Sequence, residues 1–382
     1  MIRSAVVALG IALAIVDFVR ADIFGVDENT FEIEFVTIGD PGNPADTTGA
    51  PNPAGSVDYT YRMGKYEISE GMIDKVNAIA GLGLTHGGRG SNKPATAIDL
   101  VEAAKFVNWL NASTGAAPAY KISGDGAFQL WQFGDLGFDS ANPYRNSQSR
   151  YFLPSMDEWY KAAYYDPVAE VYYDYPTGSD NPPDGIDFEG DTSFDAVYFD
   201  GGSNLEPNDV TNVGVPSPYG TVAQGGNVWE WEETDYDLGN GPGNEPRIVR
   251  GGNWYHPAMS LLSSYYMGGR VDPPDGDDTI GIRVASVGPN SDANGDGHID
   301  GTDYLIWAAA YGNDPAAIPP GPPLNGDFDY SGVVDGLDYL VWAGNYGQGP
   351  NDAVAVPEPA TFSGLLVAAA LLSQCQHRRR WH

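Results

Sequence analysis

The sequence is almost free of cysteine: the only one among its 382 residues is Cys375, close to the carboxyl terminus. A disulfide needs two cysteines, so no internal disulfide can form. If the carboxyl-terminal segment is removed from the mature protein, cysteine nucleophiles and thiolate-bound metals are excluded as well.

Basic side chains are scarce too. The chain has 19 Lys and Arg against 52 Asp and Glu, a formal net charge of −33. A surface this acidic repels phosphate backbones, so we expect no nucleic-acid partner. The charge suits a secreted, soluble protein that binds calcium. The 49 Gly and 29 Pro indicate that much of the chain is turn and irregular loop.

Neither of the apolar runs at the two ends of the chain is long. At the amino terminus, Arg3, an apolar run over 5–16 and the sequence Val-Arg-Ala at 19–21 predict a secretory signal peptide. This signal peptide covers residues 1–21 and is cut after Ala21. The alternative is a buried first strand.

In residues 354–382, the sequence Pro-Glu-Pro at 357–359 precedes an apolar run over 360–373, and three arginines follow at 378–380. This order resembles a PEP-CTERM sorting tail. Together with 354–356, this run is just long enough for a short transmembrane segment, and the arginines favour its cytoplasmic end. The resemblance implies exosortase-type sorting machinery as a partner and a secreted or cell-envelope protein. The alternative is an ordinary tail anchor.

Residues 22–287 are rich in aromatics and predict one globular domain of mixed strands and helices. The stretch at 31–40 alternates apolar and polar residues as a strand does. Residues 170–222 carry many Asp, Gly and Pro and predict a loop-rich region. The composition changes near residue 288, which marks a domain boundary.

Two helices are indicated within this domain. Residues 94–115 predict a helix capped by Thr96, with Asp99 in the capping-box position three residues later. Residues 149–166 predict a strand that leads into a second helix, with Ser155 as its N-cap.

Residues 288–350 contain two repeats that begin 35 residues apart, at Asp292 and Asp327. Each repeat fits a calcium loop position by position, with glycine at position six and oxygen donors at alternate positions, which a hard cation prefers. The predicted ligands are Asp292, Asn294, Asp296, the carbonyl of His298, Asp300 and Asp303 in the first loop, and Asp327, Asp329, Ser331, the carbonyl of Val333, Asp335 and Asp338 in the second.

Each loop runs into a similar apolar segment, YLIWAAAYG and YLVWAGNYG. The pair resembles a type I dockerin, including the Asp that closes each loop. It departs from that pattern in its Pro-rich connector at 313–326 and in the residues just before each closing Asp. The resemblance implies a cohesin-like partner, and the alternative is a calcium-stiffened spacer.

Six motifs follow one another along the large domain. They are YRMGKYEIS, PATAIDLVEAAKFVNWLN, YFLPSMDEWYKAAYY, GGNVWEWEE, RIVRGGNWYH and GIRVAS. In this order and spacing they resemble the formylglycine-generating enzyme (sulfatase-modifying factor) family, over roughly residues 31–287. The resemblance implies an irregular α+β fold of the C-type-lectin type, with little regular secondary structure.

The founding activity of that family oxidises a sulfatase cysteine to formylglycine, with molecular oxygen and a copper ion held by two cysteines. On this chain the two cysteine positions carry His256 and Leu261, and Asn253 replaces a serine, whereas Trp229 remains. Leucine cannot bind a metal, and Cu(I) prefers soft thiolates. We therefore expect no copper and no copper-thiolate catalysis, with His256 as a surface or hydrogen-bonded histidine.

The family also binds structural calcium near its GNVWEW motif. The matching positions are the backbone of Gly226 and Val228 and the carboxylate of Glu230, whereas Ala223 replaces an oxygen donor. The resemblance thus implies a weaker calcium site. For Trp229 and Trp231 we favour core packing, because large aromatic side chains are usually buried.

Three functional hypotheses remain open. The first is a non-catalytic, lectin-like domain that recognises a glycan or protein ligand at the cell surface. The second is a protein-modifying oxidoreductase that acts on sulfatases by another route. The third is a structural envelope protein docked through its calcium module.

Overall fold

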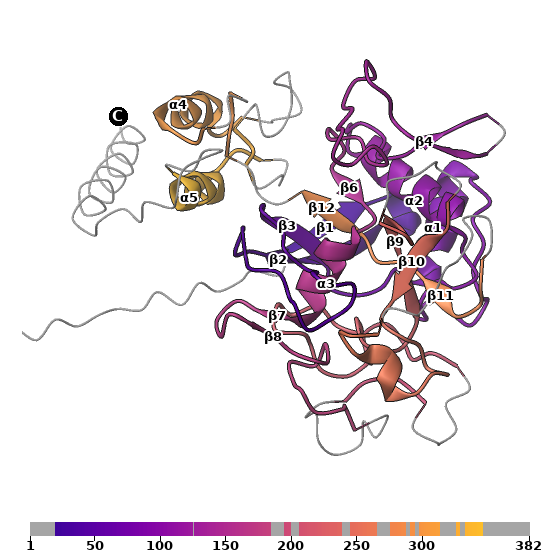
Figure 1. Cartoon of the computed structure of the whole chain (residues 1–382). Helices are drawn as coiled ribbons and strands as arrows, with labels where there is room; N and C mark the ends of the chain where they lie inside the picture. Colours follow the sequence, from indigo (N-terminus) through magenta and orange to yellow (C-terminus); the bar gives the residue numbers. More distant parts are fainter. Residues whose placement is uncertain are drawn as a thin grey trace, which may run out of the picture. The chain divides into compact units, whose positions relative to one another are not determined.

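The chain divides into two compact units, Met1–Gly288 and Pro289–His382. A computed structural model describes most of the first unit and the helical parts of the second (Figure 1). The described residues are 20–124, 126–184, 195–199, 206–238, 245–265, 276–287, 291–294, 298–313, 326–328 and 333–346.

Both predicted targeting segments fall largely outside this description. Of the predicted signal peptide, only Arg20 and Ala21 are described, and they belong to a strand. The predicted sorting tail at 354–382, with its short transmembrane segment, lies outside the described residues. Within the described ranges, the structure contains no helix with the length and apolarity needed to cross a membrane.

A five-stranded antiparallel sheet organises the first unit, with the strand order β1-β2-β3-β12-β6. Its strands are β1 (Arg20–Phe24), β2 (Phe31–Ile38), β3 (Tyr61–Gly64), β6 (Tyr151–Phe152) and β12 (Ala285–Val287). The alternation predicted at 31–40 is confirmed, because Phe31, Ile33 and Phe35 are buried while Glu32 between them is exposed.

The last strand of the unit lies in the middle of this sheet. In β12, Ala285 pairs with Met63 of β3 on one side and with Phe152 of β6 on the other. Segments from the beginning, middle and end of the domain therefore meet in one sheet (Figure 1). The result is a mixed α/β unit with a curled sheet and few helices, consistent with the C-type-lectin-like fold.

Three helices accompany the sheets: α1 (Glu70–Ala80), α2 (Leu100–Ser113) and α3 (Met156–Tyr164). The N-cap predicted for α3 is confirmed, since the side chain of Ser155 accepts a hydrogen bond from the Glu158 amide in a complete capping box. Helix α2 packs on β6, and α3 packs on β9.

The predicted start of α2 at Thr96 is wrong. The N-cap is Asp99, which forms a complete capping box with Glu102, so the predicted pattern is shifted by three residues. Ala97 has a left-handed backbone with φ of 58°, which a right-handed helix through that position cannot contain. Thr96 is buried and accepts a hydrogen bond from Arg89 instead.

A second sheet carries the residues that surround the candidate site. It has the order β10-β9-β11, with β9 (Trp229–Asp235) between β10 (Arg247–Arg250) and β11 (Ile280–Gly281). Two short ribbons, β4 (Lys121–Ile122) with β5 (Phe128–Gln129) and β7 (Tyr165–Asp166) with β8 (Val171–Tyr172), and two 3-10 turns, Asp27–Asn29 and Ala258–Leu261, complete the described elements of this unit.

The central strand β9 is almost entirely buried. Trp229 and Trp231 belong to the main hydrophobic core, which confirms the core-packing role predicted for them. The strand also buries four carboxylates, and each faces an arginine from another segment. The pairs are Glu230 with Arg283, Glu232 with Arg250, Glu233 with Arg145, and Asp235 with Arg247.

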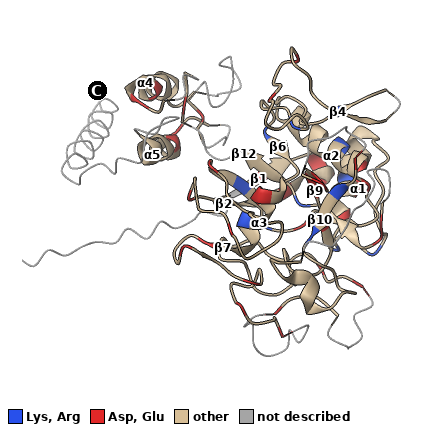
Figure 2. Ribbon diagram, in the orientation of Figure 1, with Lys and Arg blue, Asp and Glu red and all other residues tan. Residues whose placement is uncertain are grey.

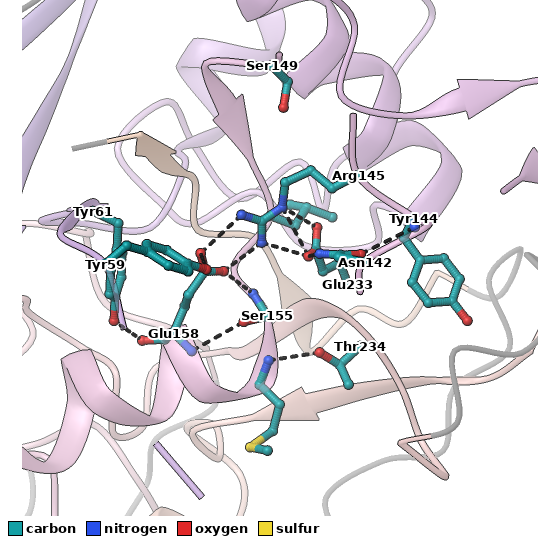
Figure 3. A network of polar contacts seen from close by, with 12 residues as sticks. Tyr59, Tyr61, Asn142, Tyr144, Arg145, Ser149, Ser155, Glu158, Glu233 and Thr234 are labelled. Carbon is teal, nitrogen blue, oxygen red and sulfur yellow. Dashed lines mark hydrogen bonds and ion pairs between the residues drawn. The ribbon is translucent and has the colours of Figure 1, made fainter. Parts of the chain in front are cut away.

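Arg145 joins β9 to helix α3, as Figure 3 shows. Its guanidinium donates to both oxygens of Glu158, at 3.0 and 2.6 Å, and to both oxygens of Glu233. The hydroxyl of Tyr59 donates to Glu158 and that of Tyr120 donates to Glu233. Burial raises the pKa of Glu158, but the attraction of Arg145 and the hydrogen bonds that Glu158 accepts together outweigh it and hold this pKa below its usual value.

Glu232 differs from the other three acids of the strand. Its side chain is 0% exposed, and neither carboxylate oxygen accepts a hydrogen bond. The nearest cationic atom, Nε of Arg250, lies 3.9 Å away, which is too far for a hydrogen bond. The effect of burial therefore outweighs the attraction of Arg250, and burial raises the pKa of Glu232 to about 8.

This raised pKa makes the stability of the first unit depend on pH. The unfolded chain releases the Glu232 proton near pH 4.5, whereas the folded chain keeps it up to about pH 8. Stability is therefore lost as the pH rises through this window. We expect the melting temperature of the native chain to fall more between pH 5 and pH 8 than that of Glu232→Gln, which cannot titrate.

Glu32→Gln, at an exposed position of β2, is the matched control. It should leave the dependence of the melting temperature on pH unchanged. If the melting temperatures of the native chain and of Glu232→Gln change with pH in the same way, the raised pKa of Glu232 is contradicted.

In the second unit, helices α4 (Gly301–Ala310) and α5 (Gly336–Asn345) pack against each other. Their N-caps are Asp300 and Asp335, which have nearly the same backbone angles. Ala293, Phe328 and Trp342 are the buried members of a small core between them.

Candidate functional site

The candidate site is the loop that follows strand β10. Gly251 and Gly252 both have positive φ, 98° and 78°, which is the conformation that glycine adopts most readily. A side chain at Gly252 would lie 2.5 Å from Oγ of Ser260 and 2.9 Å from Cδ1 of Leu261. The double-glycine turn therefore brings the start of the loop directly against the 3-10 turn at Ala258–Leu261.

Leu261, which the resemblance aligns with the second cysteine of the family, is part of an apolar cluster. It is 0% exposed and packs with Tyr175, Ala196 and Tyr198. Its carbonyl oxygen accepts a 3.0 Å hydrogen bond from the hydroxyl of Tyr164. Leu261 is thus a packed aliphatic side chain.

His256, which the resemblance aligns with the first cysteine of the family, is hydrogen-bonded to Asn253. The side-chain oxygen of Asn253 accepts hydrogen bonds from the amides of Tyr255 and His256, both at 3.0 Å, and lies 2.7 Å from Nδ1 of His256. We assign the donated proton to Nδ1, because the amide oxygen can only accept. This confirms a hydrogen-bonded histidine, whose ring meets Trp229 edge to face at 5.6 Å.

The residues at these positions do not fit the copper centre of the family. Leu261 supplies no donor atom, and the imidazole of His256 is a single nitrogen ligand without a partner thiolate. In the ranges that the structure describes, no group of three or more His, Cys, Asp or Glu side chains is placed to hold a metal ion. His86 makes other contacts: its Nε2 lies 3.0 Å from Oδ1 of Asp74.

The weaker calcium position implied at Gly226, Val228 and Glu230 is closely packed. A side chain at Gly226 would lie 2.2 Å from the carbonyl oxygen of Val197, and Val228 is fully buried. Glu230 accepts hydrogen bonds from the guanidinium of Arg283 and, at 2.6 Å, from Nε1 of Trp159. This geometry favours an ion pair over a metal ligand at Glu230.

An exposed group of side chains borders the loop, and sequence reasoning did not identify it. Tyr255, Met259 and Phe199 are 66%, 57% and 40% exposed, and the rings of Phe199 and Tyr255 lie 6.3 Å apart. The amide of Phe199 donates to the carbonyl oxygen of His256, which fixes the two segments together. The sequence gives no sign of this proximity, because Phe199 belongs to a distant loop-rich segment.

The predicted calcium loops of the second unit are described in part. Asp296, Asp329 and Ser331 lie outside the described residues. The closing carboxylates hold the two ends of each loop together. Asp303 accepts from the amides of Ala293 and Asp300, both at 2.7 Å, and Asp338 accepts from those of Phe328 and Asp335, also at 2.7 Å.

The charge of this unit fits a bound cation. Residues 288–350 contain nine Asp and no Lys or Arg, and Figure 2 shows red but no blue segments in and around α4 and α5. Asp303, Asp327 and Asp338 are nevertheless buried. These side chains supply oxygen atoms, which are the donors that calcium prefers.

The packing of Leu261 can be tested by truncation. Leu261→Ala removes a fully buried side chain, and we expect it to lower the free energy of unfolding by about 2–5 kcal/mol. Met259→Ala, two residues earlier in the same turn but exposed, should change it by less than about 0.5 kcal/mol. Chemical denaturation measures both, and equal effects would contradict a packing role for Leu261.

Comparison with known proteins agrees with this architecture. A family profile described as the sulfatase-modifying factor enzyme 1-like domain matches residues 41–287. Among solved structures, Treponema denticola variable protein 1 is similar, with 19% identity and a TM-score of 0.50 over 70% of this chain and 99% of that one. CarF has 18% identity and a TM-score of 0.47, over 67% of this chain and 98% of its own. PvdO from Pseudomonas aeruginosa has 17% identity and a TM-score of 0.44, over 70% of this chain and 98% of its own.

At 19% identity, Treponema denticola variable protein 1 shows the fold alone. No curated protein matches the chain. The family profile, however, covers well over half of the 382 residues. The chain therefore belongs to the family of sulfatase-modifying factor enzyme 1-like domains.

Proposed function

We propose that the first unit is a non-catalytic recognition domain of a secreted or cell-surface protein. The observation that carries this proposal is the chemistry at the two cysteine positions of the family. Leu261 is sealed in an apolar cluster, and His256 is held by Asn253. A copper-dependent oxidase needs thiolates at both places, while a recognition domain needs only the scaffold.

The exposed group Phe199, Tyr255 and Met259 supplies a surface for that recognition. Exposed aromatic rings on a rigid support provide contact area at a small cost in conformational entropy. Such rings stack on sugar faces and also on apolar side chains, so the ligand is a glycan or a protein. The backbone hydrogen bond between Phe199 and His256 keeps this surface in one arrangement.

A protein-modifying oxidoreductase acting on sulfatases is the alternative. It would have to activate oxygen without the thiolates that the family uses for copper. No group in the described part of the loop offers an equivalent donor set, so we favour recognition over catalysis.

The two functions predict opposite results with the purified protein. Incubated with copper, oxygen, a reductant and a sulfatase-motif peptide, it should produce no formylglycine by mass spectrometry. On panels of immobilised glycans and purified secreted proteins, it should bind a ligand that Tyr255→Ala no longer binds. The reason is that the alanine removes the largest exposed ring beside the loop.

Val168→Ala is the matched control, because Val168 is 93% exposed on a different turn of the same unit. This variant should bind as the native chain does. Formylglycine production above the level of a copper-only blank would overturn the non-catalytic assignment.

For the second unit, we propose a dockerin-like calcium module. The support is the repeated donor pattern, the buried carboxylates and the lack of Lys and Arg in residues 288–350. A cohesin-like partner would dock the protein into an assembly, as a structural envelope protein requires, while a calcium-stiffened spacer needs no partner. Exosortase-type machinery would act on the tail.

Removal of calcium should destabilise the second unit. A ligand present at a hundred times its dissociation constant stabilises the folded state by about 2.7 kcal/mol per site. We therefore expect a chelator to lower the melting temperature and speed amide exchange in residues 291–346, with little change in the first unit. Exchange mass spectrometry resolves the two units.

The double variant Asp292→Ala, Asp327→Ala removes the first ligand of both loops and should abolish the calcium response. Asp314→Ala changes the same residue type in the connector sequence and serves as its control. A native chain that shows no calcium-dependent shift would refute the calcium module.

A further inference from the structure

The two repeats of the second unit are bonded to each other in a reciprocal way. Trp307 in α4 donates its indole N–H to the carbonyl oxygen of Asp335, in the second loop, at 2.8 Å. Trp342 in α5 donates its indole N–H to the carbonyl oxygen of Asp300, in the first loop, also at 2.8 Å. Each tryptophan therefore bonds the loop of the other repeat.

The acceptors lie at a critical place in each loop. Asp300 and Asp335 occupy position nine of the predicted calcium loops and are also the N-caps of α4 and α5. The closing carboxylate of each loop, Asp303 or Asp338, accepts a hydrogen bond from the amide of this same position-nine residue. An indole bonded to the carbonyl at position nine therefore fixes the point where the loop becomes a helix.

Ring packing between the helices supports the same arrangement. Tyr304 lies 5.1 Å from Trp342, and its counterpart Tyr339 lies 5.4 Å from Trp307. The rings thus pack in tilted contacts across the repeats as well, and they limit the directions in which each indole N–H can point. Loss of the N–H alone would leave these ring contacts in place.

We propose that Trp307 and Trp342 are positioning residues, each for the calcium loop of the opposite repeat. This inference rests on the calcium module proposed above. The two loops then form one unit, in which the calcium affinity of each loop depends on the tryptophan of the other repeat. A tryptophan that only packs in the small core would affect both loops alike.

The experiment uses chains with a single working loop. Asp292→Ala leaves the second loop as the calcium site, and Asp327→Ala leaves the first. In the Asp292→Ala chain, Trp307→Phe should weaken calcium binding about three- to tenfold, the effect of one lost hydrogen bond, while Trp342→Phe should change it by less than about twofold. In the Asp327→Ala chain the two variants should exchange these effects, as measured by calorimetric titration.

A metal-free measurement keeps this inference separate from the calcium module. Without calcium, Trp307→Phe should speed amide exchange at the start of α5 more than at the start of α4, and Trp342→Phe should do the reverse. If the native chain binds no calcium, the calcium module fails, and the exchange pattern alone decides whether the indoles hold the opposite loops.

Two results would overturn the inference. One is an equal effect of both tryptophan variants on whichever loop remains, and the other is a larger effect of each variant on its own repeat. If a phenylalanine variant unfolds the unit, benzothienylalanine at the same position decides the question. It keeps a bicyclic ring of similar size and replaces the N–H by sulfur, so only the hydrogen bond is lost.

Discussion

The first unit depends on the compensation of buried charge along strand β9. Three acids of this strand form close ion pairs with arginines outside it. Asp235 pairs with Arg247 of β10, Glu230 pairs with Arg283 before β12, and Glu233 pairs with Arg145, which also binds Glu158 of α3. Removing one partner of such a pair leaves an isolated buried charge, which is strongly destabilising. In a chain with so few basic side chains, placing four arginines around one strand defines which segments must meet.

This arrangement explains how the loop after β10 is held in place. The ion pairs, the tryptophans of β9 and the double-glycine turn hold the loop in place, and none of them needs a metal ion. Within the loop, the packing of Leu261 and the hydrogen bonds between Asn253 and His256 add local contacts. These contacts help to fix the shape of the loop.

The sequence predicted those parts of the structure that depend on local patterns. Strand β2, the cap of α3, the burial of Trp229 and Trp231, and the family itself follow from alternation, capping and motif order. The start of α2 was misplaced because a capping pattern occurs twice in succession, and only the backbone at Ala97 distinguishes the two. The arginine partners of β9 and the approach of Phe199 to Tyr255 depend on tertiary contacts between distant segments, which one sequence does not reveal.

The central position of β12 has a consequence for the order of folding. Its neighbour β3 is made more than 200 residues earlier, so the sheet stays open until the last residues of the domain are available. Contacts of such long sequence separation form slowly, since the intervening chain must first be closed into a loop. The domain therefore cannot complete its sheet until the chain has been synthesised through β12.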